Sequence, residues 1–463
     1  MDKANDWLIL GAGIAGLTAG RELARQGYRV TVVEQAAEVG GLARTVEMEG
    51  FRFDLGGHRF HSHNPSVVRW LQALLGDDLL TVPRVSHIYL NGRYVDYPLK
   101  LPGALSAFPP RQAAGMALDY LLARWTERGR QDRSFEDWVI RRFGRQMYRQ
   151  FFQPYTEKVW GIPADQLSAE WAAQRIGLPS LWQAFRQALR PAAIPPPTAI
   201  SHFYYPRRGF GLIPQALARE FQALGGVLLT GVTPTALTPQ PDGWRLALAE
   251  GGGIWQAPHL ISTIPLPALL ALWPPETGSR ALAERMTLTY RGLVCVCLAL
   301  NKSRVGEDSW TYFPDARLIF GRTHEPKNWS AAMTPDPDAT SLCVEIFTDP
   351  QAAEWQRSDS DLQARVVQQL HALGWLTLAD VRYAKVVRVR HAYPVYHVGY
   401  RAQLEAAQAF LGQWPRLHLL GRTGTFRYMN SDGVIEEVFD FLRRLHLAGG
   451  EVHRPAVADR RWV

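Results

Sequence analysis

Trp7-Leu8-Ile9-Leu10-Gly11-Ala12-Gly13-Ile14-Ala15-Gly16 carries the clearest indication of the fold. Its first four residues are apolar, which is typical of a short, buried parallel strand. Gly11 permits a tight turn, Gly13 lets the backbone approach a pyrophosphate, and Gly16 lets the next helix pack closely on the strand. The unpaired N–H groups at the start of that helix favour phosphate. The stretch therefore predicts a strand, a glycine turn and a helix that bind a dinucleotide.

The residues that follow give this motif its context. A second strand is expected at 28–33 and ends in Glu34, whose carboxylate is placed to accept a hydrogen bond from a ribose hydroxyl and disfavours a 2′-phosphate there. A second glycine turn at 40–45 carries Arg44, a cation suited to a diphosphate. The loop at 53–58 then ends in Gly56-Gly57-His58.

This arrangement resembles the FAD-dependent superfamily of amine oxidases, protoporphyrinogen oxidases, phytoene desaturases and UDP-galactopyranose mutases. The resemblance implies FAD as the cofactor, an adenine-side strand at 226–230, a returning strand at 260–265 and a late strand at 417–422 that leads to the flavin. The residues expected to hold FAD are Gly11, Gly13, Ile14, Ala15, Gly16, Glu34, Gln35, Gly41, Leu42, Ala43, Arg44, Gly57, His58, Val232, Gly421, Arg422, Asn430, Asp432, Gly433 and Val434.

The expected fold class is α/β, with a discontinuous Rossmann-like FAD-binding domain in residues 1–90, 200–265 and 395–463. Residues 100–195 have a helical pattern, in which Ser134 can cap a helix with Asp137 three residues on, and they predict a helical substrate domain. Residues 266–394 contain short alternating apolar runs and predict an antiparallel sheet that covers the flavin. Cys295 and Cys297 lie two apart in one such run, so we expect them to be buried.

Four motifs narrow the resemblance to the UDP-galactopyranose mutases. They are Gly56-Gly57-His58, the stretch 154–161, the stretch 310–314 followed by Arg322, and the stretch 421–428. The resemblance implies that reduced FAD is the active form, that its N5 attacks the anomeric carbon as the nucleotide diphosphate leaves, and that NADH or NADPH is a candidate reductant. One departure leaves the sugar and nucleotide open: Asp432 is present, but Gly433 and Val434 stand where mutases carry a histidine.

Such a reaction needs cations at the leaving diphosphate, because negative charge grows there. By the resemblance, Arg322 and Arg422 clamp the diphosphate, Arg175 lies near the sugar, and His58 lies against the flavin. The expected catalytic residues are His58, Arg175, Arg322 and Arg422. The expected substrate-binding residues are Trp310, Tyr312, Arg322, Tyr393, Arg422 and Tyr428. Each has an alternative, since arginines in a basic chain are often ion-paired at the surface, and Trp310 and the tyrosines can simply pack in the core.

Composition excludes several other classes. The net charge of +8 is dispersed without a Lys/Arg block, which suits a small anionic ligand and disfavours nucleic acid. His58, His61 and His63 lack further ligands at metal-binding spacing, so no metal is expected. No apolar run reaches the ~18–20 residues of a membrane span, and the polar start predicts no signal peptide. The three cysteines are too few for a disulfide framework, so the cytoplasm is expected.

The sequence thus favours an enzyme, a flavin-dependent nucleotide-sugar mutase (an isomerase) that acts on UDP-galactopyranose and UDP-galactofuranose or a close relative. The alternative is an FAD-dependent oxidoreductase of the same superfamily, an oxidase or desaturase of an apolar substrate similar to protoporphyrinogen oxidase. A third hypothesis is a non-catalytic flavoprotein that acts through its basic surface. The oligomeric state stays open.

Overall fold

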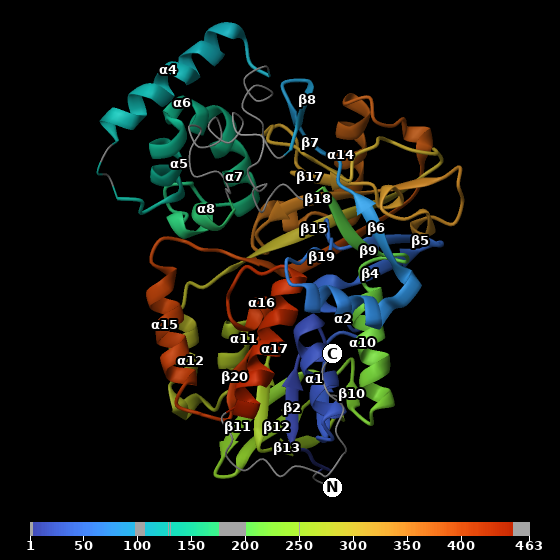
Figure 1. Ribbon diagram of the computed structural model, residues 1–463, viewed down its shortest axis with the longest axis vertical. Coiled ribbons are helices and arrows are strands. Elements are labelled where there is room, and N and C mark those ends of the chain that lie inside the picture. Colours follow the sequence, from blue (N-terminus) through green and yellow to red (C-terminus); the bar gives the residue numbers. More distant parts are fainter. Residues whose placement is uncertain are drawn as a thin grey trace.

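A five-stranded parallel sheet forms the lower half of the molecule in Figure 1. The structure is a computed structural model, and it describes residues 3–97, 107–127, 129, 131–175, 201–249 and 251–447. In spatial order the strands are β10 (Val227–Leu229), β3 (Val30–Val33), β2 (Trp7–Leu10), β14 (His259–Ser262) and β20 (Leu417–Leu419). Strands from three distant parts of the chain are neighbours, which confirms the discontinuous Rossmann-like fold.

Helices cover this sheet and bury its side chains. Helix α1 (Ile14–Arg25) contacts α10 (Leu212–Ala223) and α17 (Ser431–Leu447). All four residues of β2 are fully buried, as expected for a central parallel strand. A smaller four-stranded sheet lies beside it, in the order β1 (Lys3–Ala4), β13 (Ile254–Ala257), β12 (Gly243–Leu248) and β11 (Pro234–Gln240).

A seven-stranded sheet forms the other large layer. Its order is β19 (Val381–Pro394), β15 (Tyr290–Leu300), β18 (Thr340–Thr348), β17 (Arg322–His324), β16 (Trp310–Tyr312), β7 (Ser86–Leu90) and β8 (Arg93–Asp96). All neighbours are antiparallel except β16 and β7, so the predicted antiparallel sheet is present. The predicted boundary at residue 90 assigned β7 to the FAD-binding part, whereas its hydrogen bonds to β16 place it in this sheet.

Apolar side chains fill both faces of this second sheet. Helix α14 (Asp359–Ala372) packs on one face, and the hairpin β4 (Thr45–Met48) and β5 (Phe51–Asp54) packs on the other. Cys295, Cys297 and Cys343 lie under that hairpin and are buried and free, which confirms the prediction for the first two. A second hairpin pairs β6 (Leu79–Pro83) with β9 (His202–Pro206).

The helical part lies at the upper left of Figure 1. It contains α4 (Pro110–Thr126), α5 (Phe135–Phe143), α6 (Arg145–Met147), the π-helix η3 (Tyr148–Phe152), α7 (Gln153–Trp160) and α8 (Ala169–Arg175). Ser134 and Asp137 form the predicted capping box at the start of α5. Arg291 of β15 donates to the backbone oxygens of Lys158 and Val159 at the end of α7, which fastens this part to the sheet. Residues 176–200, the rest of the predicted helical stretch, lie outside the described part.

The remaining helices connect these layers. They are α2 (Pro65–Leu75), α11 (Leu266–Ala271), α12 (Ser279–Arg285), α13 (Ala353–Gln356), α15 (Tyr400–Leu411) and α16 (Gly421–Gly424). No helix in the described ranges has the length and hydropathy of a membrane span. The turn after β2, the loop after β5, the segment around α16 and the edge of β17 and β18 meet between the two large sheets. Of the predicted site residues, Gly57, Arg322 and Gly421 lie there.

Candidate functional site

Two glycine turns lie back to back at the end of β2. Gly11 has a φ of +99°, and a Cβ built on Gly16 would lie 1.9 Å from the Gly11 carbonyl oxygen, so the tight turn and the close helix packing are as predicted. Gly13 bridges to Gly40, and a Cβ on Gly13 would meet only the Gly40 oxygen, at 3.9 Å. The backbone of Gly13 is therefore open on one side, which fits the approach of a diphosphate.

Glu34 holds its carboxylate beside the first glycine turn. Its two oxygens accept hydrogen bonds from the backbone N–H of Ala12 at 2.8 Å and of Ala36 at 2.9 Å. The Val232 N–H donates to the backbone oxygen of Glu34 at 3.2 Å, so Val232 lies on the same side. In dinucleotide sites of this kind, an acidic residue at this position accepts a hydrogen bond from a ribose hydroxyl. The residues present therefore fit FAD.

Polar groups on the facing segments complete this part of the site. Arg44, on the second glycine turn, has a buried Nε without a hydrogen-bond partner among the described residues. Helix α17 begins at Ser431, and the Val434 N–H donates to the Asn430 carbonyl oxygen. Burial raises the pKa of Asp432 in the first turn of this helix. A half-buried cation and a helix N-terminus are groups that favour an anionic ligand.

Gly421 has a packing role that the sequence did not indicate. Its φ is +78°, and a Cβ there would lie 2.7 Å from the Cβ of Ala15 on α1. Its N–H donates to Oε2 of Glu437 at 2.6 Å, so this donor is engaged within the protein. Glycine is needed here because α16 approaches α1 so closely.

Arg322 lies against the loop that ends in His58, and it is ion-paired. Its Nε donates to Oε1 of Glu345 at 2.8 Å, and its Nη2 donates to Oε2 of the same carboxylate. Nη2 also lies 3.3 Å from the Tyr393 hydroxyl. A Cβ on Gly57 would lie 3.6 Å from the Arg322 guanidinium carbon, at van der Waals contact, so the loop lies directly beside this group.

Glu345 is fully buried on β18, and the sequence analysis did not select it. Burial alone raises the pKa of Glu345, but the Arg322 guanidinium and a hydrogen bond from His324 outweigh it and lower the pKa to about 2. The carboxylate is therefore ionised at neutral pH. The sequence did contain a signal for Glu345. It is the single charged residue of the strand Thr340–Thr348, in which every residue is buried, and a buried charge needs a partner.

Arg422 differs from Arg322 because it lies against aromatic rings. Its guanidinium carbon is 4.7 Å from the ring centre of Tyr393 and 4.3 Å from that of Tyr428. Its Nε and Nη2 atoms are buried and have no hydrogen-bond partner in the described part of the chain. A buried guanidinium with two such donors is poised for an anion.

His58 stacks on Phe210, with the ring centres 5.2 Å apart. Burial and the nearby Arg422 and Arg322 lower the pKa of His58 to about 3. Its Nδ1 atom is buried and has no hydrogen-bond partner among the described residues. The imidazole is therefore neutral at physiological pH, and it offers a lone pair or an N–H to a neighbouring group.

Tyrosines line the site on the side of the seven-stranded sheet. Tyr312 pairs with Arg322 in the β16–β17 register, and its ring lies 5.6 Å from Tyr155 and 4.9 Å from Tyr97. Tyr155 of α7 also lies on this wall, although it was not among the expected site residues. Its burial, and to a smaller extent the neighbouring Tyr312 hydroxyl, raises the pKa of Tyr155. The hydroxyl groups of Tyr155, Tyr312, Tyr393 and Tyr428 are potential hydrogen-bond donors on this wall.

Trp310 lies apart from these residues. Its side chain is 2% exposed, and Phe203 and the guanidinium groups of Arg59 and Arg84 contact its ring. This surrounding favours the alternative of core packing over stacking on a base. Arg175 is the last residue of α8, and its side chain is outside the described part. Within that part, no cluster of His, Cys, Asp and Glu could hold a metal ion.

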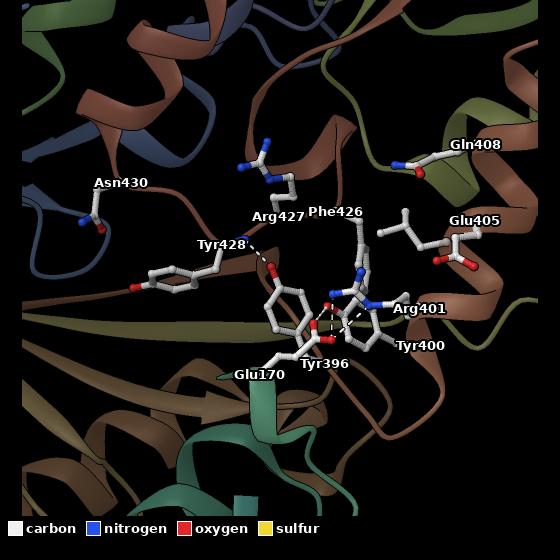
Figure 2. A pocket seen from close by; sticks show the side chains of 11 residues that line it. Glu170, Tyr396, Tyr400, Arg401, Glu405, Gln408, Phe426, Arg427, Tyr428 and Asn430 are labelled. Atoms are coloured by element: carbon white, nitrogen blue, oxygen red, sulfur yellow. Dashed lines mark hydrogen bonds and ion pairs between the residues drawn. The ribbon is translucent and has the colours of Figure 1, made fainter. Parts of the chain in front are cut away.

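A polar pocket of about 600 Å³ opens next to Tyr428 (Figure 2). The Tyr428 N–H donates to the Tyr396 hydroxyl at 2.6 Å on its floor. Glu170 of α8 accepts from the Tyr400 hydroxyl at 2.7 Å and pairs with Arg401. The pocket is lined by Glu170, Tyr396, Tyr400, Arg401, Leu404, Glu405, Gln408, Phe426, Arg427, Tyr428 and Asn430. Of the expected site residues, it thus includes Tyr428 and Asn430, and its α15 wall was not predicted.

Known proteins resemble the chain in sequence. The family model described as "flavin containing amine oxidoreductase" matches residues 14–430. A "probable UDP-galactopyranose mutase" from Klebsiella pneumoniae is 28% identical over 169 residues, which are 35% of this chain and 42% of that protein. A coproporphyrinogen III oxidase from Mycobacterium tuberculosis is 27% identical over 287 residues, 58% of this chain and 60% of that protein. The chain thus spans less than two thirds of the length of each.

Solved structures resemble it in fold over nearly the whole chain. A reduced UDP-galactopyranose mutase superimposes with a TM-score of 0.83 at 24% identity and covers 96% of both chains. A "putative protoporphyrinogen oxidase" from Exiguobacterium sp. 255-15 superimposes with a TM-score of 0.75 at 18% identity, over 97% of this chain and 100% of that one. At these identities the likeness concerns the fold.

Proposed function

This chain belongs to the family of flavin-containing amine oxidoreductases, and from that premise we propose that it is an FAD-dependent nucleotide-sugar mutase. The proposed reaction interconverts the pyranose and furanose forms of UDP-galactose or a close relative, in the cytoplasm. Reduced FAD, when bound, would supply the nucleophile at the anomeric carbon, with NADH or NADPH as the candidate reductant. The residues that fit FAD are the glycines of the two turns, Glu34, Arg44 and the start of α17.

One observation carries the proposal. Arg422 presents two buried nitrogen donors that no described residue satisfies, between the rings of Tyr393 and Tyr428. A leaving diphosphate needs a cation as its negative charge develops, since the cation then stabilises the transition state more than the ground state. The tyrosine hydroxyls donate further hydrogen bonds, and His58, held neutral, adds no competing charge.

The remaining residues position these groups. Glu345 neutralises Arg322 and fixes its direction, and the loop of His58 lies beside the guanidinium at Gly57. The pocket beside Tyr428 offers polar side chains and about 600 Å³ of space for the part of the substrate that does not react.

The test is to reduce the bound flavin with dithionite, add UDP-galactofuranose and separate the sugars by chromatography. Conversion to the pyranose form is expected, with loss of conversion in Arg422→Ala. No conversion of any of a panel of UDP-, GDP- and dTDP-furanoses would contradict the proposal.

The second candidate is an FAD-dependent oxidoreductase of an apolar substrate. It is favoured by the match to a coproporphyrinogen III oxidase, which covers more of this chain than the match to the mutase does. Oxygen- or quinone-dependent turnover of such a substrate that persists in Arg422→Ala would support it.

A further inference from the structure

Helix α4 exposes a stripe of large apolar side chains on its outward face. The exposed fractions are 59% for Leu118, 55% for Leu121, 53% for Leu122 and 76% for Trp125. These four positions have the spacing i, i+3, i+4 and i+7, so they share one face of the helix. We call them the α4 stripe. In Figure 1, α4 lies at the edge of the molecule, at the end opposite the five-stranded sheet.

The opposite face of α4 already anchors the helix. Met116 and Ala123 are buried there, and α4 contacts α5 and α6. The helix is therefore apolar on both faces, which is typical of a helix that is covered on both sides. The inner face supplies the packing of α4 against α5 and α6, and a cluster of exposed apolar side chains such as the α4 stripe marks a contact site on a surface.

The charges of α4 are arranged unevenly around the helix. Its own acid Asp119 accepts from the Gln146 N–H at 2.6 Å, and Glu127, at the end of the helix, pairs with Arg145 at 3.7 Å, so both acids face the protein. Arg111 is exposed, and it lies seven residues before Leu118, on the face of the stripe. Among the described side chains of α4, the outer face is thus apolar and basic, in a chain with a net charge of +8.

We propose that the α4 stripe docks this protein on an anionic lipid surface, with α4 lying in the plane of the interface. Leucine and tryptophan on one face with an arginine beside them are the groups that such a surface binds. A stable protein dimer needs roughly 20–30 residues on each side, many more than this stripe supplies. A lipid surface needs no matching shape, so four side chains and a cation suffice for reversible binding.

The experiment is flotation of the full-length, FAD-loaded protein with two kinds of vesicle, phosphatidylcholine alone and phosphatidylcholine mixed with phosphatidylglycerol. Wild type is expected to float with the mixed vesicles and to stay behind with the neutral ones at low salt. Leu121→Gln with Leu122→Gln is expected to weaken binding at least about tenfold. Arg111→Gln is expected to weaken vesicle binding about fivefold, which is the contribution of one basic residue near an anionic surface.

Leu378→Gln is the matched control, because Leu378 is 67% exposed on a different surface element, η7 (Leu378–Asp380). Trp125→Gln is a second variant of the stripe, and flavin content with far-UV circular dichroism verifies the fold of each. Absence of wild-type flotation, or equal flotation of the double variant, overturns the proposal. A wild-type dimer in sedimentation velocity that the double variant converts to monomer also overturns it, since a second copy then covers the stripe.

Discussion

Arg322 and Glu345 form a two-point ion pair, in which Nε of the arginine donates to the buried carboxylate at 2.8 Å. Arg422, by contrast, has aromatic neighbours and two donors that no described residue satisfies. Both arginines were expected to clamp a diphosphate in the same way. Their surroundings differ, because Glu345 balances the charge of Arg322 whereas two donors of Arg422 have no described partner, and we therefore propose that Arg422 meets the anion and that Arg322 shapes the site.

Replacement of Glu345 by Gln is expected to reduce both stability and activity. The change leaves Arg322 without its counter-charge, and breaking a buried ion pair typically costs about 3–5 kcal/mol. A misdirected Arg322 is expected to lower kcat roughly 10²-fold, as small displacements in a site do. Urea unfolding and the mutase assay measure the two effects. Glu354→Gln is the control, because Glu354 is an exposed acid near Arg357.

The same pair gives a pH dependence of stability. The pKa of Glu345 is about 2 in the folded protein and 4.5 in the reference state, so its stabilisation is complete above 4.5 and is lost as the pH falls toward 2. The difference amounts to roughly 3 kcal/mol. Acid unfolding curves of wild type and Glu345→Gln should therefore converge below pH 4. Curves that stay parallel would show that the pair does not contribute in this way.

Replacement of Arg422 by Ala is expected to lower activity without lowering stability. Loss of one preorganised donor to a developing anion typically costs about 10²–10³ in kcat. The folded protein loses a buried cation that no described residue neutralises, so its melting temperature should be unchanged or higher. Thermal unfolding and kcat together test this, with the exposed Arg416→Ala as control. A large drop in melting temperature would mean that Arg422 is a structural residue.

The sequence predicted the fold well because its signals were local. The glycine spacing at 11–16 specifies a tight turn and a close helix contact, and both require only neighbouring residues. Strands at 226–230 and 260–265 were expected in the FAD-binding part from the resemblance alone, and the parallel pairing of β10 with β3 and of β14 with β2 places both strands there. The register of β7 with β16 was missed, because pairing between distant strands leaves no local pattern.

The site was predicted only in part, for a similar reason. Residue type and motif indicated Arg322, Arg422 and His58, but not which partner each would have. Glu345 lies 23 positions from Arg322 and faces it only through the β17–β18 pairing. The wall of the pocket on α15 likewise joins α8 through Glu170 and Arg401, a contact between residues 231 positions apart. Such contacts follow from the tertiary fold.

The pKa of His58 gives a further prediction. Its pKa is about 3 in the folded protein and 6.5 in the reference state. Between pH 6.5 and pH 3, His58 is therefore protonated in the unfolded chain and neutral in the folded protein. The stabilisation from a neutral His58 is complete above 6.5 and is lost as the pH falls toward 3. His58→Phe keeps the stacking on Phe210 and removes this titration, so its stability should fall less than that of wild type between pH 6.5 and 5. Urea unfolding at several pH values measures the difference, and equal slopes would contradict it.

Replacement of Gly13 or Gly16 by alanine should have different effects on stability, although both should weaken FAD binding. In Gly16→Ala the new Cβ would lie 1.9 Å from the Gly11 carbonyl oxygen, a backbone atom that cannot yield, so the turn must open and the protein should lose stability as well as FAD. In Gly13→Ala the nearest protein atom is 3.9 Å away, so the apoprotein should fold normally. Its Cβ would instead occupy the side from which a diphosphate approaches, and FAD affinity alone should fall. The ratio of flavin to protein absorbance and the melting temperature of each apoprotein separate the two effects. A Gly13→Ala protein that retains full FAD would show that the diphosphate does not approach Gly13.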